Sequence, residues 1–304
     1  MNLSTASLFP GMAAFRPQLL DALLASDDVR SRFMSVLAIQ AQAVDNMDTD
    51  VLAERGAVMA AKDTGSAGRN LALFDPESAY CMMTEINRRE VCYKAQFSEL
   101  SQMGSGLVEL KEAGKDLARI TLSTSDADIV SGLQQFVAQY NRWIQRFDAD
   151  LRQGGMLADI RAAQISQYEL EQGVKNTFHG ARDGLRGVSD LGITIDPGSR
   201  LALLDFARLD SVLANTRQGV VDTLQEFGAN FAKSADLLYA AGNFIPRQLD
   251  NLQRAIRYMA ENKTDWRAEF GTGDSARPAG QVARALAAYT AMFETPVTRN
   301  LGNA

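Results

Sequence analysis

Few residues in this chain are able to support metal or nucleophilic chemistry. Among its 304 residues there is one histidine, His179, and there are two cysteines, Cys81 and Cys92. A histidine-based zinc or iron site needs several imidazoles, and the cysteines lie about 16 Å apart along the axis of an expected helix. At that distance they can neither pair nor chelate an ion with His179 through local spacing. We expect two buried or half-buried, reduced thiols and no metal.

The remaining candidates for catalysis are equally weak. A Ser-His-Asp arrangement needs His179 in a cleft, but it lies near an expected helix end, where a solvated histidine that compensates the helix dipole is far more common. Gly104-Ser-Gly106 and Gly271-Thr-Gly273 lack the preceding strand and the third glycine of a nucleotide-binding loop. The carboxylates are scattered over polar helix faces. The sequence therefore predicts a protein that is not an enzyme, with no catalytic residues, no cofactor and no metal.

Composition and charge exclude further classes of function. With 46% apolar residues, 22% charged residues and 7 prolines, the chain is able to bury a sizeable core. Its 31 basic and 37 acidic residues give a net charge of -6 without a Lys/Arg cluster, so nucleic acid is not an expected partner. Apolar runs are far shorter than the roughly 20 residues that span a bilayer, so no membrane partner is expected. The first ten residues lack the basic and apolar regions of a cleaved signal peptide.

Helical periodicity dominates the elements that must position any site. Two stripes with near-heptad spacing, from Ile86 to Leu117 and from Leu249 to Phe270, predict an antiparallel helix pair. Three glycines in the first of these helices mark either a close helix contact or a kink. We expect a mainly α fold, an elongated helical bundle or antiparallel coiled coil with one small β-hairpin. The helix-pairing residues are predicted to be Ile86, Tyr93, Phe97, Leu100, Leu107, Leu252, Ile256 and Met259.

The hairpin is predicted over residues 191–204, where strand-like alternation interrupts the helical pattern. The isoleucines of the first strand are expected to share one apolar side with Leu201 and Leu203 of the second. Asp196-Pro-Gly198-Ser is the expected turn, with the glycine at a positive φ. Because two strands alone are marginal in water, this hairpin must dock on helices from elsewhere in the chain.

The chain is expected to have three parts. Residues 1–75 are predicted to be an N-terminal helical segment and linker, 76–270 a helical domain that contains hairpin 191–204, and 271–304 a C-terminal loop and helix. Apolar stripes in the first and last parts lie beside glycine- and proline-containing breaks. We expect both parts to become ordered only when the chain associates with neighbouring subunits.

Residues of the predicted helix and hairpin follow one another in the order of a known family. They are Phe136, Val137, Tyr140, Asn141, Leu191, Gly192, Ile193, Asp196 and Gly198. This order resembles the C-terminal leg region of flagellar filament-capping proteins, also called hook-associated protein 2, over residues 128–270. The segment from Ile86 to Leu100 is similar to the family's N-terminal arm. The β-rich head domains of the family are missing here, because only Ser123 to Asp128 separates the two parts.

The resemblance implies a structural component of the bacterial flagellum. It implies secretion through the flagellar type III export channel without a cleaved signal peptide, self-association into a homo-oligomer, and flagellin or hook-junction proteins as partners. If the head domains form the filament cap, a member without them assembles on the flagellum but does not cap it. The alternative is a cytoplasmic helical adaptor or an export-chaperone-like binding module.

Overall fold

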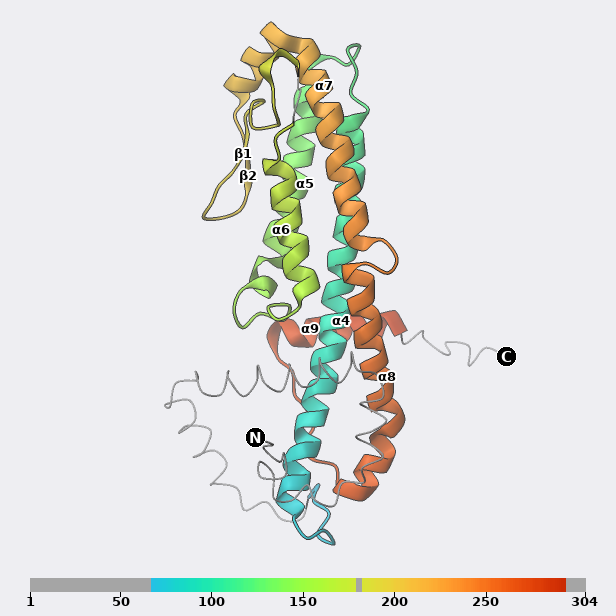
Figure 1. The fold of residues 1–304 in the computed structure, drawn as a ribbon. Helices are drawn as coiled ribbons and strands as arrows, with labels where there is room; N and C mark the ends of the chain where they lie inside the picture. Colours follow the sequence, from blue (N-terminus) through green and yellow to red (C-terminus); the bar gives the residue numbers. More distant parts are fainter. Residues whose placement is uncertain (1–66, 179–181, 294–304) are drawn as a thin grey trace, which may run out of the picture. The chain divides into compact units, whose positions relative to one another are not determined.

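The computed structural model describes residues 67–178 and 182–293. These fall in two compact units, one holding the chain up to Glu85 with Asp265–Asp274, the other holding Ile86–Thr264 with the chain from Ser275 onward. The elements are α4 (Pro76–Ala118), α5 (Asp126–Leu151), α6 (Arg161–Lys175), η3 (Arg182–Gly184), β1 (Ile193–Ile195), β2 (Ala202–Leu204), α7 (Phe206–Tyr239), α8 (Phe244–Phe270) and α9 (Gly280–Phe293) (Figure 1).

The mainly α fold with one small β-hairpin is confirmed for this part of the chain. Two of its helices begin at residues whose side chains cap them. The Ser125 hydroxyl accepts the Asp128 N–H at the start of α5, and the Asp205 carboxylate accepts the Arg208 N–H at the start of α7, both at 3.1 Å. Predictions for residues 1–66, including the apolar stripes there, and for His179 fall outside the described residues.

The core of the second unit is formed by α4, α5, α6 and α7, with α5 and α6 running beside α4 and α7 (Figure 1). The Phe136 ring of α5 meets two rings of α7 edge-on, Phe227 at 5.2 Å and Phe231 at 4.9 Å between centroids. Leu100 and Leu107 of α4 are fully buried in the same cluster. Burial of each such side chain contributes about 1.5–3 kcal/mol to the free energy of unfolding, so this core stabilises the unit.

Within the second unit, α4 has two successive antiparallel partners. Glu90 of α4 pairs with Lys263 of α8, whereas Lys111, further along α4, pairs with Asp236 of α7 at 2.7 Å. The sequence predicted α8 as the partner along the whole stripe, and the structure places α7 beside its second half. The chain changes partner because α7 and α8 are separate helices, divided at Gly242, where φ is 77°.

The glycines of α4 mark close helix contacts. A Cβ atom added at Gly114 would lie 3.0 Å from the carbonyl oxygen of Gly228 in α7, and one added at Gly228 would lie 2.4 Å from that of Gly114. Gly104 and Gly106 lie directly against aromatic side chains of α7 and α5. Since α4 continues as one helix through all three positions, the structure favours close contact over a kink.

The first unit joins the segment before α4 to the end of α8. The Arg69 guanidinium pairs with Glu77 and lies 4.2 Å from the centre of the Tyr80 ring. The Thr272 N–H donates to the Gly68 carbonyl at 2.9 Å. These contacts fix the loop that precedes α4. No helix within the described ranges is long and apolar enough to cross a membrane.

Candidate interaction surface

One side chain of α5, Asn141, forms two hydrogen bonds with the hairpin. Its amide nitrogen donates to the Ala202 carbonyl at 2.9 Å, and its amide oxygen accepts the Ala202 N–H at 2.7 Å. Asn141 thus forms hydrogen bonds with the main-chain groups on the free edge of β2, as a neighbouring strand would. Because buried main-chain groups need partners, this pair of bonds gives the two-stranded sheet the support that it lacks alone.

The register of the hairpin decides which of its side chains are buried. Ile193 pairs with Leu204, Thr194 with Leu203, and Ile195 with Ala202. Ile193 and Ala202 are buried, whereas Leu203 is 56% exposed. The expectation that Leu203 shares the buried side with the isoleucines is therefore wrong. Side chains alternate along a strand, and this register puts Leu203 on the outer face beside Thr194.

The turn of the hairpin is closed by Asp196. Its carboxylate accepts the N–H and the hydroxyl of Ser199, each at 2.6 Å, and these bonds hold the pKa of Asp196 below its usual range. The Arg200 N–H donates to the Asp196 carbonyl at 2.8 Å, which closes a five-residue turn with Arg200 at a φ of 60°. The expectation of a positive φ at Gly198 is wrong, because the longer turn moves that conformation to Arg200.

The base of the hairpin needs a glycine at position 192. Gly192 has a φ of 95°, and a Cβ atom there would lie 2.7 Å from the carbonyl oxygen of Asp205. The Asp205 N–H in turn donates to the Gly192 carbonyl at 2.9 Å. The hairpin thus closes tightly against the first turn of α7, with Leu191 fully buried beside it.

The other motif residues of α5 belong to the core. Phe136 and Tyr140 are buried, and Val137 packs against the same cluster while partly exposed. The Tyr140 hydroxyl has no hydrogen-bond partner among the described residues, and burial raises its pKa, so the phenol stays protonated. The Phe-Val-x-x-Tyr-Asn segment therefore fixes α5 in the core with its apolar members and holds the hairpin with its asparagine.

The predicted helix-pairing residues divide into two groups. Leu100, Leu107, Leu252 and Ile256 are buried, and Ile86, Tyr93, Phe97 and Met259 are half-buried. The Phe97 ring contacts α9, with ring centres 5.7 Å from Tyr289 and 5.5 Å from Phe293. The structure thus brings Phe97 together with the C-terminal helix, a contact that no periodicity in α4 specifies. Because α9 packs on α4 within the single chain, the expectation that residues 271–304 become ordered only on association is wrong for residues 280–293.

A charged cluster that the sequence did not reveal joins α4, α5 and α9. Arg146 donates to Glu99 at 2.6 Å and to Asp150 at 3.3 Å, and Gln281 of α9 donates to the other Asp150 oxygen. Glu99 and Asp150 are only 3% and 0% exposed. Burial, with the Glu99 charge, raises the pKa of Asp150 to about 6 despite Arg146. The only sequence signal, an Arg and an Asp four positions apart, is too common on helix surfaces to single them out.

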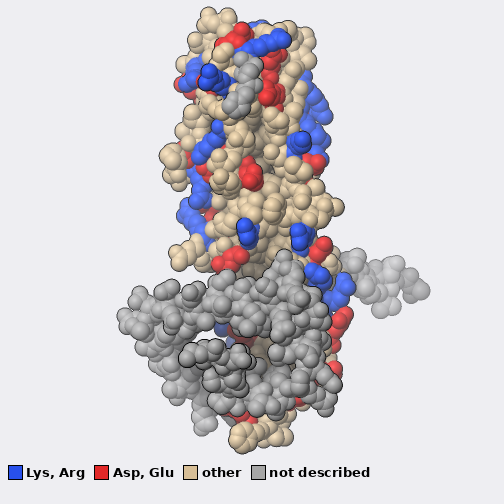
Figure 2. Space-filling view, in the orientation of Figure 1, with Lys and Arg blue, Asp and Glu red and all other residues tan. Residues whose placement is uncertain are grey.

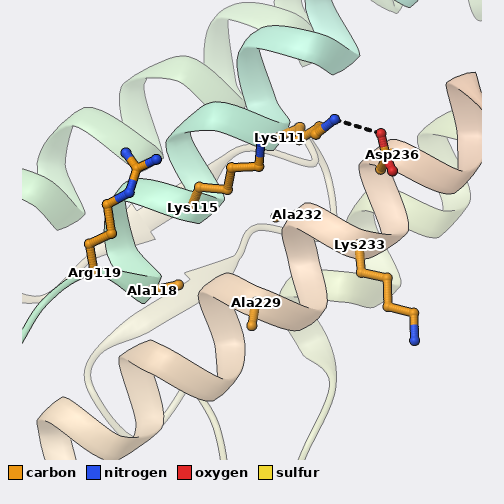
Figure 3. A pocket seen from close by; sticks show the side chains of 8 residues that line it. All are labelled: Lys111, Lys115, Ala118, Arg119, Ala229, Ala232, Lys233 and Asp236. Carbon is orange, nitrogen blue, oxygen red and sulfur yellow. Dashed lines mark hydrogen bonds and ion pairs between the residues drawn. The ribbon is translucent and has the colours of Figure 1, made fainter.

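A shallow groove of about 430 Å³ lies between α4 and α7 where the two helices approach (Figure 3). Its floor consists of small side chains, and its rim carries four cations and one acid; the lining residues are Lys111, Lys115, Ala118, Arg119, Ala229, Ala232, Lys233 and Asp236. Three of the cations already form ion pairs. Lys111 pairs with Asp236, and Lys115 and Arg119 each pair with an acid of their own helix. An open groove with paired charges does not enclose a substrate.

Within residues 67–178 and 182–293, the side chains able to bind metal or to act as nucleophiles do not gather at one place. Cys81 and Cys92 are both exposed on α4, so the expectation of buried or half-buried thiols is wrong. In the described portion of the chain, no group of three or more His, Cys, Asp or Glu residues could hold a metal ion. The face shown in Figure 2 carries basic and acidic side chains interspersed, without a field of one sign.

Exposed apolar side chains are the remaining surface feature. In the second unit they include Leu203 and Phe206 at the hairpin and Leu237 and Phe244 at the connection of α7 to α8, each about half exposed. Contiguous exposed apolar patches are typical of protein interaction surfaces, and these residues are the candidates for such a patch. Comparisons of this chain with protein-family models, with curated proteins and with solved structures found no match.

Proposed function

We propose that this chain is a non-enzymatic structural component of the bacterial flagellum that is exported through the flagellar type III channel. It associates with itself and contacts flagellin or hook-junction proteins. The observation that carries the proposal is the convergence of the family-like residues. Asn141 and Ala202 lie 61 positions apart and form one hydrogen-bonded unit, which Gly192 closes and Asp196 caps.

Such convergence supports the resemblance to filament-capping proteins. The resemblance assigns the α5 motif and the hairpin to one leg region, and in this chain the two segments are in contact through Asn141. The two antiparallel pairings of α4, with α8 near Glu90 and with α7 near Lys111, suit the long helical leg that this family uses.

The surface supports an assembly role. Leu203 and Phe206 project from the hairpin region, where a neighbouring subunit could cover them. Without the β-rich head domains, the chain is proposed to bind along the flagellum through its helical leg and not to cover the filament tip.

Self-association is tested by light scattering over a concentration series. We expect the full chain to form larger species as concentration rises, and a Leu203→Glu, Phe206→Glu double variant to need a higher concentration for the same mass. Tyr168→Glu is the matched control, since Tyr168 is 59% exposed on α6. A chain that stays monomeric at every concentration contradicts the proposal and favours a helical adaptor.

A further inference from the structure

We propose that docking of α9 on α4 and α5 is controlled by protonation of the Asp150 side chain. This inference is independent of the flagellar role. It starts from how α9 is held: Gln281 at its beginning donates to Asp150, and Tyr289 and Phe293 at its end pack on Phe97. Only Ala285 of α9 is fully buried. An element with so few buried contacts opens more readily than the core helices.

The Asp150 carboxylate lies in an unbalanced charge cluster. Among the described residues, the charged groups that face it are Arg146 of its own helix and Glu99 of α4, and α9 contributes the neutral amide of Gln281. Gln102 of α4 also accepts from Arg146, at 2.9 Å. Two buried carboxylates therefore share one guanidinium. Protonation of Asp150 removes the excess negative charge and so lowers the electrostatic free energy of the cluster, because Arg146 then pairs with Glu99 as the remaining carboxylate.

Undocking of α9 changes this balance. The departing Gln281 amide uncovers an Asp150 oxygen, and water then reaches the carboxylate and favours its charged form. At the other end of α9, burial of Glu90 is outweighed by the ammonium groups of Lys263 and Lys94, which hold the pKa of Glu90 below its usual range. Glu90 therefore stays ionised at mildly acidic pH, and Asp150 is the group that titrates there.

The sign of the effect follows from linkage. In the docked state burial and the Glu99 charge raise the pKa of Asp150 to about 6, and access of water after undocking lowers it toward the ordinary value of 3.8, so docking takes up a proton. Docking is therefore favoured at low pH, and this advantage is lost as pH rises through about 6. Between about pH 5 and pH 7.5 these two pKa values give a decrease of up to about tenfold in the docking equilibrium constant.

Hydrogen exchange of the α9 amides in the full chain tests the proposal. After correction for intrinsic exchange rates, we expect α9 protection to fall by up to about tenfold from pH 5 to pH 7.5, while protection of α7 changes little. Asp150→Asn keeps an oxygen for Gln281 but removes the titration, so its α9 protection should be the same at both pH values. Asp148→Asn, on the same helix and paired with Arg152, should behave like the unchanged chain.

A second variant keeps the proposal testable if Asp150→Asn does not fold. Gln281→Glu puts a carboxylate against Asp150, so the pair should share a proton and the loss of α9 protection with pH should become steeper than in the unchanged chain. The proposal is overturned if α9 protection is independent of pH in the unchanged chain, if Asp150→Asn retains the full pH dependence, or if Gln281→Glu leaves it unaltered.

Discussion

At the scale of single residues, Asn141 and Gly192 make two distinct contributions to the position of the hairpin. Asn141 supplies two hydrogen bonds to the edge of β2, and Gly192 supplies the space for the first turn of α7. Both residues belong to the pattern that resembles the capping family. Their effects on stability can be measured separately, because one acts through lost bonds and the other through a steric clash.

Asn141→Ala should lower the free energy of unfolding by about 1–3 kcal/mol, because the buried Ala202 N–H and C=O lose their partner. Urea denaturation measures the change. Gln145→Ala is the matched control, since Gln145 is exposed on the same helix and its loss should stay within about 0.5 kcal/mol. Equal stabilities of the two variants would show that Asn141 does not hold the hairpin.

Gly192→Ala should destabilise the chain by at least about 2 kcal/mol, since it adds a clash with the Asp205 carbonyl to an unfavourable φ. Gly198→Ala should stay within about 0.5 kcal/mol of the unchanged chain, because its φ is not positive and the nearest atom to the new Cβ is 3.5 Å away. Thermal melts compare the two. A larger loss for Gly198→Ala would mean that the hairpin closes differently.

The sequence identified the motif residues but not what they touch. Asp196 was predictable as a turn residue because its bonds are local. The partner of Asn141 could not be predicted, because an asparagine on a helix does not indicate which strand edge, here 61 positions away, it will contact. Likewise, Glu99 and Asp150 look like ordinary surface acids until the helices that bury them are packed.

At the scale of elements, the contacts of α4 organise the second unit. Gly114 and Gly228 set how closely α4 and α7 approach, and Lys263 holds α8 beside the earlier part of α4. The sequence predicted the α4 stripe and the hairpin, because both follow from periodicity and turn residues. It did not predict that the second half of α4 packs against α7 instead of α8. Apolar stripes of similar spacing fit the same partner helix equally well, and the lengths and connections of the helices decide between them.

Gly228→Ala should cost about 1–3 kcal/mol of stability, because the added Cβ would lie 2.4 Å from the Gly114 carbonyl oxygen and force the helices apart. Gly132→Ala on α5 should instead stabilise by up to about 1 kcal/mol, since its Cβ meets only ordinary contacts at 3.7 Å or more and alanine favours the helix. Chemical denaturation gives both values. The same sign for both variants would refute close α4–α7 contact at this point.

Ile256→Ala should cost about 2–5 kcal/mol, because Ile256 of α8 is only 6% exposed. Leu237→Ala, at a position 52% exposed near the end of α7, should change stability by no more than about 0.5 kcal/mol. An Ile256→Ala variant as stable as the Leu237→Ala control would show that α8 does not contribute a buried side chain to the helix pairing at this position.

At the scale of the whole molecule, we propose a helical protein that assembles with copies of itself. The described residues bury their apolar stripes in helix contacts and leave apolar side chains such as Leu203 and Phe206 exposed. The mainly α class was predictable because helical periodicity runs through most of the chain. The proposed location of the protein on the flagellum could not be predicted from composition and spacing, because these do not specify the partners on which export and assembly depend.

The central claim is tested most directly by where the protein is found. In flagellated cells, the fraction of the protein in the medium and on sheared flagella is measured by immunoblot, and compared with cells whose flagellar export channel is blocked. The account predicts that the protein is found outside the cell and on flagella only when export is intact, and that it accumulates inside when export is blocked. Retention inside the cell under both conditions would contradict the flagellar role and favour a helical adaptor.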